Sequence, residues 1–203
     1  MNEEKRIGIY GGTFSPPHRG HYRALKAFIE HEKPQKTLVI PTFLPPHKQI
    51  KGDATPQERL EMCQLAFSSL PVTVSDLEIA RGGKSYTALT LETLCSPNTT
   101  LLFLCGTDMF LSMDSWYEPQ TIFSLAEIVY IRRETDAETA KELAKKADFY
   151  RKKFKATVRE ISCDTLEISS TEIRNAILSG GDTSAILDPN VRRYIDECQL
   201  YRK

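Results

Sequence analysis

The stretch GGTFSPPHRGH, residues 11–21, combines two glycines, two adjacent prolines and two histidines that stand three positions apart. It directly follows the apolar run RIGIY (residues 6–10), which is typical of a short buried strand. Ligands of a doubly wound α/β sheet bind beyond the carboxyl ends of the strands, and paired glycines there let a ligand approach the backbone. The prolines fix φ angles suited to entering a helix. We expect His18 and His21 to share a face of its first turn.

Strand-like runs and helical patterns alternate along the rest of the chain. Short strand-like runs recur at residues 37–41, 72–76, 100–106, 126–133 and 156–162, with helical patterns between them, including 18–31 and 56–69. This order predicts an α/β fold with a doubly wound parallel sheet. Residues 169–195 read as two or three short helices, broken at Gly180-Gly181 and Asp188-Pro189. We expect one domain over residues 1–203, with residues 168–203 as a small helical C-terminal part.

Composition excludes several classes of function. Lys+Arg and Asp+Glu both total 27 in 203 residues, so no global basic surface favours nucleic acid as a partner. No apolar stretch is long enough to span a membrane, and the charged N-terminus has no signal-like region. Five cysteines without a C-x-x-C pair are typical of reduced thiols. We expect a soluble cytoplasmic protein without nucleic-acid or membrane partners, and whether it forms a homo-oligomer stays open.

Two imidazoles at the positive end of a helix suit the binding of phosphate. The same H-x-x-H spacing also occurs in half of a metal site and in ordinary polar helix starts. Metal is disfavoured because the stretch contains no Cys, Asp or Glu to complete the coordination. A dinucleotide fingerprint is excluded, because Thr13 and Pro16 stand where G-x-G-x-x-G needs glycines.

A second segment, LEISSTEIRNAI (residues 166–177), runs from a short strand into a helix. Ser169 and Glu172 fit a capping box, which alone is a common helix start. Arg174 in the same turn fits a plain cap poorly, because a cation opposes the helix dipole unless an anion is shared. The two segments together favour phosphate chemistry.

GGTFSPPHRGH and ISSTEIR resemble the two defining motifs of the nucleotidyltransferase superfamily, H-x-G-H and I-S-S-T-x-I-R, whose fold is Rossmann-like. Within it, the chain is similar to the bacterial nicotinate-nucleotide adenylyltransferases, because further motifs recur in their order: PPHK (45–48), RGGKSYT (81–87), GTD (106–108), Trp116 and IRR (131–133). The resemblance implies attack by the 5'-phosphate of nicotinate mononucleotide on the α-phosphorus of ATP. The products are nicotinate adenine dinucleotide and pyrophosphate, in NAD biosynthesis, with Mg²⁺ as cofactor.

The resemblance also implies roles for individual residues. It implies that catalysis rests on His18, His21 and Arg174. The residues implied for ATP binding are Gly11, Gly12, Thr13, Phe14, His18, His21, Ser170, Thr171 and Arg174. Those implied for nicotinate mononucleotide are His47, Lys48, Ser85, Tyr86, Thr87, Asp108, Trp116 and Arg133. No residue is assigned as a dedicated metal ligand, because nucleotide-bound Mg²⁺ is held mainly by phosphates and water.

Plainer interpretations stay open for some of these residues. PPHK is also an ordinary proline-rich turn, Trp116 also fits a core residue, and Asp108 also fits the cap of a following helix. A nucleotide sensor without catalysis and an adenylyltransferase for nicotinamide mononucleotide or phosphopantetheine are the alternative functions. Ser15 and Leu89 depart from the family pattern, which commonly has Asp at both positions.

Overall fold

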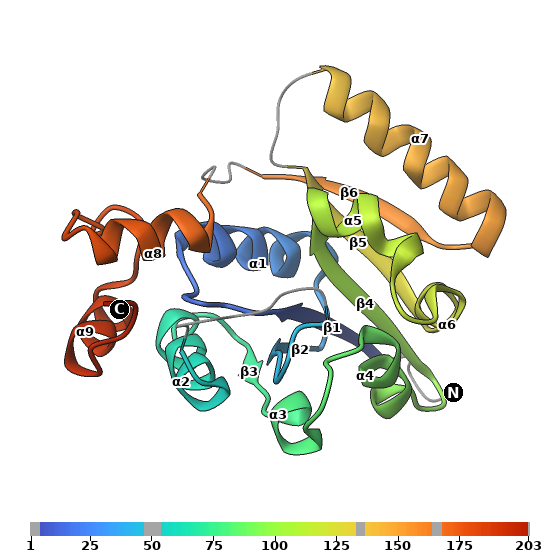
Figure 1. Ribbon diagram of the computed structural model, residues 1–203. Helices are drawn as coiled ribbons and strands as arrows, with labels where there is room; N and C mark the ends of the chain where they lie inside the picture. The colour runs from blue at the N-terminus through green and yellow to red at the C-terminus, as the bar shows by residue number, and fades with distance from the viewer. Residues whose placement is uncertain (1–4, 47–53, 133–136, 164–167, 203) are drawn as a thin grey trace.

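The computed structural model describes residues 5–46, 54–132, 137–163 and 168–202. Within these ranges the strands form one parallel sheet in the order β3-β2-β1-β4-β5-β6 (Figure 1). The strands are β1 Lys5–Gly12, β2 Lys36–Pro41, β3 Thr73–Val74, β4 Thr99–Gly106, β5 Ala126–Arg132 and β6 Val158–Ser162. The predicted Rossmann-like α/β fold is confirmed.

Helices cover both faces of this sheet because alternate side chains of each strand enter different cores. Tyr10 and Leu102 belong to one core, and Ile9 and Phe103 belong to the other. The helices that the first core joins to the sheet are α1 Arg19–Glu32, α2 Pro56–Ala66, α8 Ser170–Leu178 and α9 Pro189–Glu197. Those around the second core are α3 Leu77–Arg81, α4 Thr87–Leu94, α5 Thr107–Ser112, the 3-10 turn η1 Met113–Ser115, α6 Pro119–Leu125 and α7 Ala137–Phe154.

The strand order reverses between β1 and β4, which both run parallel and pair with each other. From this point the chain winds outward in opposite directions, so the loops after the two strands separate and leave a crevice. The crevice lies beyond Gly12 and Gly106, where β1 and β4 end.

The first motif differs in two details from the expectation. Gly11 and Gly12 do not follow the strand but end it, and they pair with β2. A Cβ on Gly12 would lie 2.9 Å from the ring of Phe14, so this glycine makes room for the chain's own aromatic ring. His18 has extended backbone angles, φ −142° and ψ 172°, so it precedes helix α1 as its N-cap and Arg19 is the first helical residue.

The C-terminal segment contains helices α8 and α9, which lie at one end of the molecule, α8 beside α1 and α9 beside α2 (Figure 1). Leu187, Val191 and Ile195 bury their side chains in the core shared with α1 and α2. The N–H of Arg19 donates to the carbonyl of Ile186, which joins the start of α1 to this segment. Across the described ranges, no helix has the length and apolar character needed to cross a membrane.

Candidate active site

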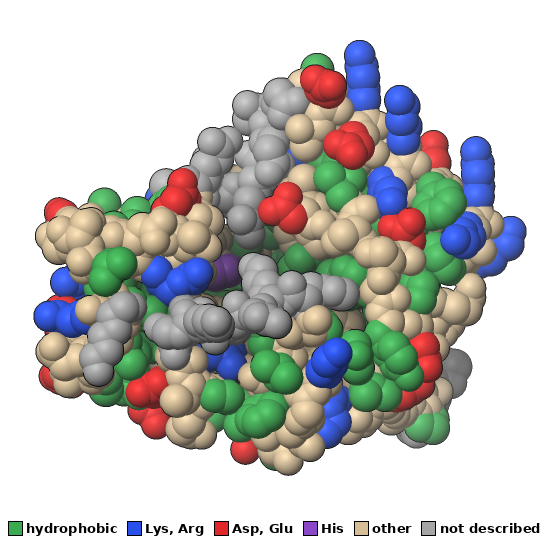
Figure 2. All heavy atoms as spheres, in the orientation of Figure 1, with side chains coloured by type: hydrophobic (Ala, Val, Ile, Leu, Met, Phe, Trp, Pro, Cys, Tyr) green, Lys and Arg blue, Asp and Glu red, His purple; other side chains and the backbone are tan. Residues whose placement is uncertain are grey.

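A cavity of about 540 Å³ lies at the carboxyl ends of β1 and β4, where the strand order reverses. Its walls come from the loop between β1 and α1, the starts of α4 and α5, and the start of α8. Figure 2 shows histidine surface, in purple, inside a recess near the centre of this face of the molecule.

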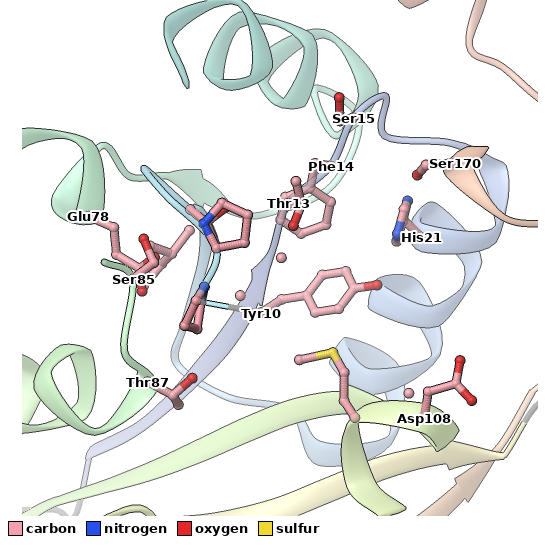
Figure 3. A pocket seen from close by; sticks show the side chains of 18 of the residues that line it. Tyr10, Thr13, Phe14, Ser15, His21, Glu78, Ser85, Thr87, Asp108 and Ser170 are labelled. Carbon is pink, nitrogen blue, oxygen red and sulfur yellow. The ribbon is translucent and has the colours of Figure 1, made fainter. Parts of the chain in front are cut away.

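The cavity brings together every predicted site residue that lies in the described ranges. These are Gly11, Gly12, Thr13, Phe14, His18, His21, Ser85, Tyr86, Thr87, Asp108, Trp116, Ser170, Thr171 and Arg174. His21 and Ser170 lie on one side of it, and Ser85 and Thr87 lie on the other (Figure 3). His47, Lys48 and Arg133, also predicted for the mononucleotide, lie outside the described residues.

The two histidines form a reciprocal cap at the start of α1. Nδ1 of His18 accepts hydrogen bonds from the N–H groups of Gly20 and His21, at 3.1 and 3.4 Å. Nδ1 of His21 accepts from the N–H of His18 at 3.2 Å. This is the geometry of a capping box, with imidazoles in the places usually taken by Ser or Thr and by Glu.

The cap fixes which nitrogen of each ring carries the proton. A neutral imidazole whose Nδ1 accepts a hydrogen bond is protonated at Nε2, which makes Nε2 a donor. The rings are held against each other with their centroids 3.7 Å apart, and His18 is only 4% exposed. Phe14 supports His21 edge-on at 5.1 Å. The local fold therefore presets a pair of N–H donors in the wall of the cavity.

Helix α8 contacts the same loop on the side of the cavity where His21 lies (Figure 3). Ser169 and Glu172 form the predicted capping box, and the hydrogen bond from the N–H of Ser169 lowers the pKa of the Glu172 carboxyl. Ser170 Oγ donates to the carbonyl of Pro16 at 3.0 Å. Arg174 donates to the carbonyl of Ser15 at 2.8 Å and to Thr171 at 3.2 Å. Arg174 therefore braces the histidine loop, a contact that the sequence did not predict.

The SYT segment is held to the loop after β2. Ser85 Oγ accepts from the N–H of Phe43 at 2.8 Å, and the N–H of Ser85 donates to the carbonyl of Leu44 at 2.8 Å. Tyr86 is the N-cap of α4, but its side chain makes no cap hydrogen bond to the first turn of the helix. Its ring stacks on Tyr117 at 4.4 Å. The bonds of Ser85 thus hold the segment before α4 in place. No side chain of the N-cap residue caps the first turn of this helix, which faces the cavity.

The positions of Trp116 and Asp108 test the alternatives that Trp116 is a core residue and that Asp108 caps a helix. Trp116 is only half-buried, packs edge-on against Phe103 at 6.4 Å, and lines the cavity, so it is not simply a core residue. Asp108 is exposed in the first turn of α5, whose N-cap is Gly106, so Asp108 does not cap that helix.

Glu78 lines the cavity, although sequence reasoning missed it. It is 5% exposed, and its Oε1 accepts a hydrogen bond of 2.6 Å from Thr90, to which Arg81 also donates. Its Oε2 is buried without a hydrogen-bond partner among the described residues. Leu89, the departure from the family pattern, does not line the cavity, whereas Glu78 supplies an acid beside the SYT segment. No spacing in the sequence links Glu78 to that segment.

Arg59 of α2 is a second residue that sequence reasoning missed. It is buried, and its guanidinium donates to the carbonyls of Thr13 and Phe43 at 2.8 and 3.1 Å. It thereby joins the loops that follow β1 and β2. The available signal was an arginine on the buried face of a well-capped helix, a position that normally requires polar partners.

Comparisons with known proteins agree with this geometry. The cytidylyltransferase-like family model matches residues 9–176. The chain is 33% identical to a protein of Desulfatibacillum aliphaticivorans named "Probable nicotinate-nucleotide adenylyltransferase", over 97% of this chain and 99% of the relative. Identity to a protein of the same name from Desulfitobacterium hafniense is 37%, over 98% and 96% of the two chains. The chain belongs to the nicotinate-nucleotide adenylyltransferase family, within the cytidylyltransferase-like proteins.

A solved structure shares the fold of this family member. Plasmodium falciparum nicotinic acid mononucleotide adenylyltransferase, complexed with NaAD, superposes with a TM-score of 0.76 and 21% identity, covering 97% of each chain. The resemblance inferred from the H-x-G-H and I-S-S-T-x-I-R motifs is therefore confirmed. In the described part of this family member, no three His, Cys, Asp or Glu side chains come together in a way that could hold a metal ion.

Proposed function

We propose that the protein transfers the adenylyl group of ATP to nicotinate mononucleotide in the cytoplasm, releasing pyrophosphate and forming nicotinate adenine dinucleotide. The observation that carries this proposal is the convergence of two motif segments on one cavity. The histidine pair and the start of α8 lie on one side, and the SYT segment lies on the other (Figure 3). The cavity therefore has a wall of donors suited to phosphate and a separate wall for an acceptor.

The reaction needs charge stabilisation and alignment but no nucleophile from the protein. An oxygen of the mononucleotide 5'-phosphate forms a bond to the α-phosphorus, and the bond from that phosphorus to the bridging oxygen of pyrophosphate breaks. In this proposal, Nε2–H of His18 and His21 donates to the phosphate oxygens as their charge is redistributed. Arg174, Ser170 and Thr171 bind the β- and γ-phosphates of the leaving group.

The acceptor side is suited to a pyridine carboxylate. The first turn of α4 has N–H groups without a side-chain cap, and a helix start of this kind binds an anion. We propose that the nicotinate carboxylate accepts hydrogen bonds there, beside Tyr86 and Thr87, while Trp116 stacks on the ring. The amide of nicotinamide would turn a donor toward these donors, which costs about 1–3 kcal/mol for each group left unpaired.

Mg²⁺ fits this site as an ion carried by the nucleotide. Asp108 is an exposed carboxylate at the edge of the cavity and would provide one oxygen ligand, with phosphates and water providing the others. Bound in this way, the ion would neutralise phosphate charge. Ribose hydroxyls are the other ligand to which Asp108 is suited.

The test is an acceptor panel with ATP and Mg²⁺, measuring pyrophosphate release with nicotinate mononucleotide, nicotinamide mononucleotide and phosphopantetheine. We expect kcat/KM for the acid to exceed that for the amide by at least about tenfold, the lower end of what one mismatched hydrogen bond yields. Equal use of acid and amide would contradict the assignment at the start of α4. No pyrophosphate with any acceptor would contradict adenylyl transfer itself and favour a nucleotide sensor.

A further inference from the structure

The C-terminal tail reaches the loop that carries the histidines. Tyr201 Oη and Ser15 Oγ form a hydrogen bond of 3.1 Å across 186 positions of sequence. Both residues are buried, at 6% and 2% exposure. The ring of Tyr201 packs in the same core as Phe14, which supports His21.

The backbone around Tyr201 has an unusual conformation. Gln199 and Tyr201 have φ angles of 54° and 60°, in the left-handed region that side chains disfavour. Residues stay in this region when the surrounding contacts hold them there. The hydrogen bond to Ser15 and the packing of the Tyr201 ring are contacts of this kind.

Ser15 is the point where two parts of the C-terminal segment meet the loop. Its hydroxyl bonds Tyr201, and its carbonyl accepts from Arg174. Three residues later, His18 caps α1, and these cap hydrogen bonds to its Nδ1 fix the direction of its Nε2 atom. A shift of Ser15 would therefore move both a phosphate-binding cation and a donor aimed at the reacting phosphate.

We propose that Tyr201 is a positioning residue for nucleotidyl transfer, which acts through Ser15 to fix the loop that orients His18 and His21. The proposal rests on the proposed function for its kinetic consequence. Its structural part, the coupling from the tail to the imidazoles, is independent of the substrates. Ser15, which replaces the family's usual Asp, keeps an oxygen in place for this bond.

The experiment compares kcat and KM for the wild type, Tyr201→Phe, Ser15→Ala and the double variant. Tyr201→Phe keeps the buried ring and removes only the hydroxyl. We expect each single variant to lower kcat about three- to tenfold, because small displacements of catalytic groups slow the reaction steeply, with little change in KM. The double variant should be no slower than the slower single variant, because both substitutions break the same bond.

Tyr194→Phe is the matched control, because it removes a similar hydroxyl from the same C-terminal segment. Tyr194 Oη donates to Glu61 of α2 at 2.6 Å, and no hydrogen bond joins its hydroxyl to a described residue of the histidine loop. We expect Tyr194→Phe to lower the melting temperature at least as much as Tyr201→Phe while leaving kcat unchanged. An equal fall in kcat for both variants, or a double variant whose loss is the product of the single losses, would overturn the proposal.

A second readout does not depend on turnover. Nitrogen NMR signals of the His18 and His21 rings report their hydrogen bonding, and we expect them to shift in Tyr201→Phe but not in Tyr194→Phe. Unchanged ring signals in Tyr201→Phe would overturn the coupling even where the adenylyl transfer is confirmed. If the wild type released no pyrophosphate with any acceptor, the function would fail, while a selective shift of the ring signals would still support the coupling.

Discussion

Replacing His18 separates two tasks that the structure gives to one imidazole. Its Nδ1 caps helix α1, and its Nε2 is the donor that we propose acts on the reacting phosphate. Alanine removes both atoms. Asparagine places an oxygen near the position of Nδ1 and is among the best N-cap residues. Glutamine extends an N–H donor toward the position of Nε2 but gives up the cap.

The size of each effect follows from these atoms. Loss of an N-cap costs about 1 kcal/mol, which in a chain of this size lowers the melting temperature by about 2–4 °C. Loss of a donor aimed at developing charge lowers kcat by about a hundredfold or more. We therefore expect His18→Ala to lose stability and turnover, His18→Asn to recover stability alone, and His18→Gln to recover part of the turnover alone.

Thermal unfolding and steady-state pyrophosphate release measure the two quantities on the same preparations, with near-ultraviolet circular dichroism to establish that each variant is folded. All three replacements remove the ring that packs on His21, so that loss is common to them. Near-normal turnover in folded His18→Ala would refute the donor role. Equal melting temperatures for the Ala and Asn variants would refute the cap.

Three further substitutions test other parts of the site. Arg174→Ala should raise the dissociation constant for ATP at least about tenfold by calorimetry, because it removes charge-assisted hydrogen bonds. Unchanged affinity would limit Arg174 to its structural role of bracing the histidine loop. Trp116→Ala should lower kcat/KM for nicotinate and nicotinamide mononucleotides by similar factors of up to about tenfold, because stacking does not distinguish acid from amide. A change in the ratio of the two kcat/KM values would contradict this. Hydrogen bonds from Ser169 hold the pKa of Glu172 below its ordinary value of 4.5, so the ionised cap stabilises the fold above that pH and is lost as pH falls through the lower, folded value. The difference in melting temperature between wild type and Glu172→Gln should therefore be constant near neutral pH and shrink below about pH 4.5, and a pH-independent difference would refute this cause.

The fold was predictable because its signals are local. Parallel strands buried on both faces read as short apolar runs, and the helices between and after them carry start signals such as Thr55-Pro56 and Ser169-x-x-Glu172. The cavity lies where two motif segments meet, one at the end of β1 and one at the start of α8. Chain order and local periodicity were sufficient for the fold, whereas bringing the two motif segments to one site also rested on the family resemblance.

Other features of the site depend on contacts that no local pattern encodes. Histidine is not a usual capping residue, so the reciprocal cap of His18 and His21 was not expected. Glu78 of α3 lines the cavity and accepts a hydrogen bond from Thr90 of α4, and Tyr201 meets Ser15 across 186 positions of sequence. Such contacts are fixed by packing between distant elements rather than by spacing.

The starts of α1 and α8, which both line the phosphate side of the cavity, differ in a way that bears on their proposed roles. The first turn of α1 contains no acidic residue, because a neutral imidazole occupies the place where a capping box usually has Glu. Its N-terminal dipole is therefore left uncompensated by a charged side chain and favours an anionic ligand. Helix α8 has Glu172 in its own capping box, which offsets its dipole. An anion at α8 is then attracted by a cation instead, and Arg174, two residues after Glu172, provides one. This accounts for an arginine near a helix start where the dipole alone would disfavour it.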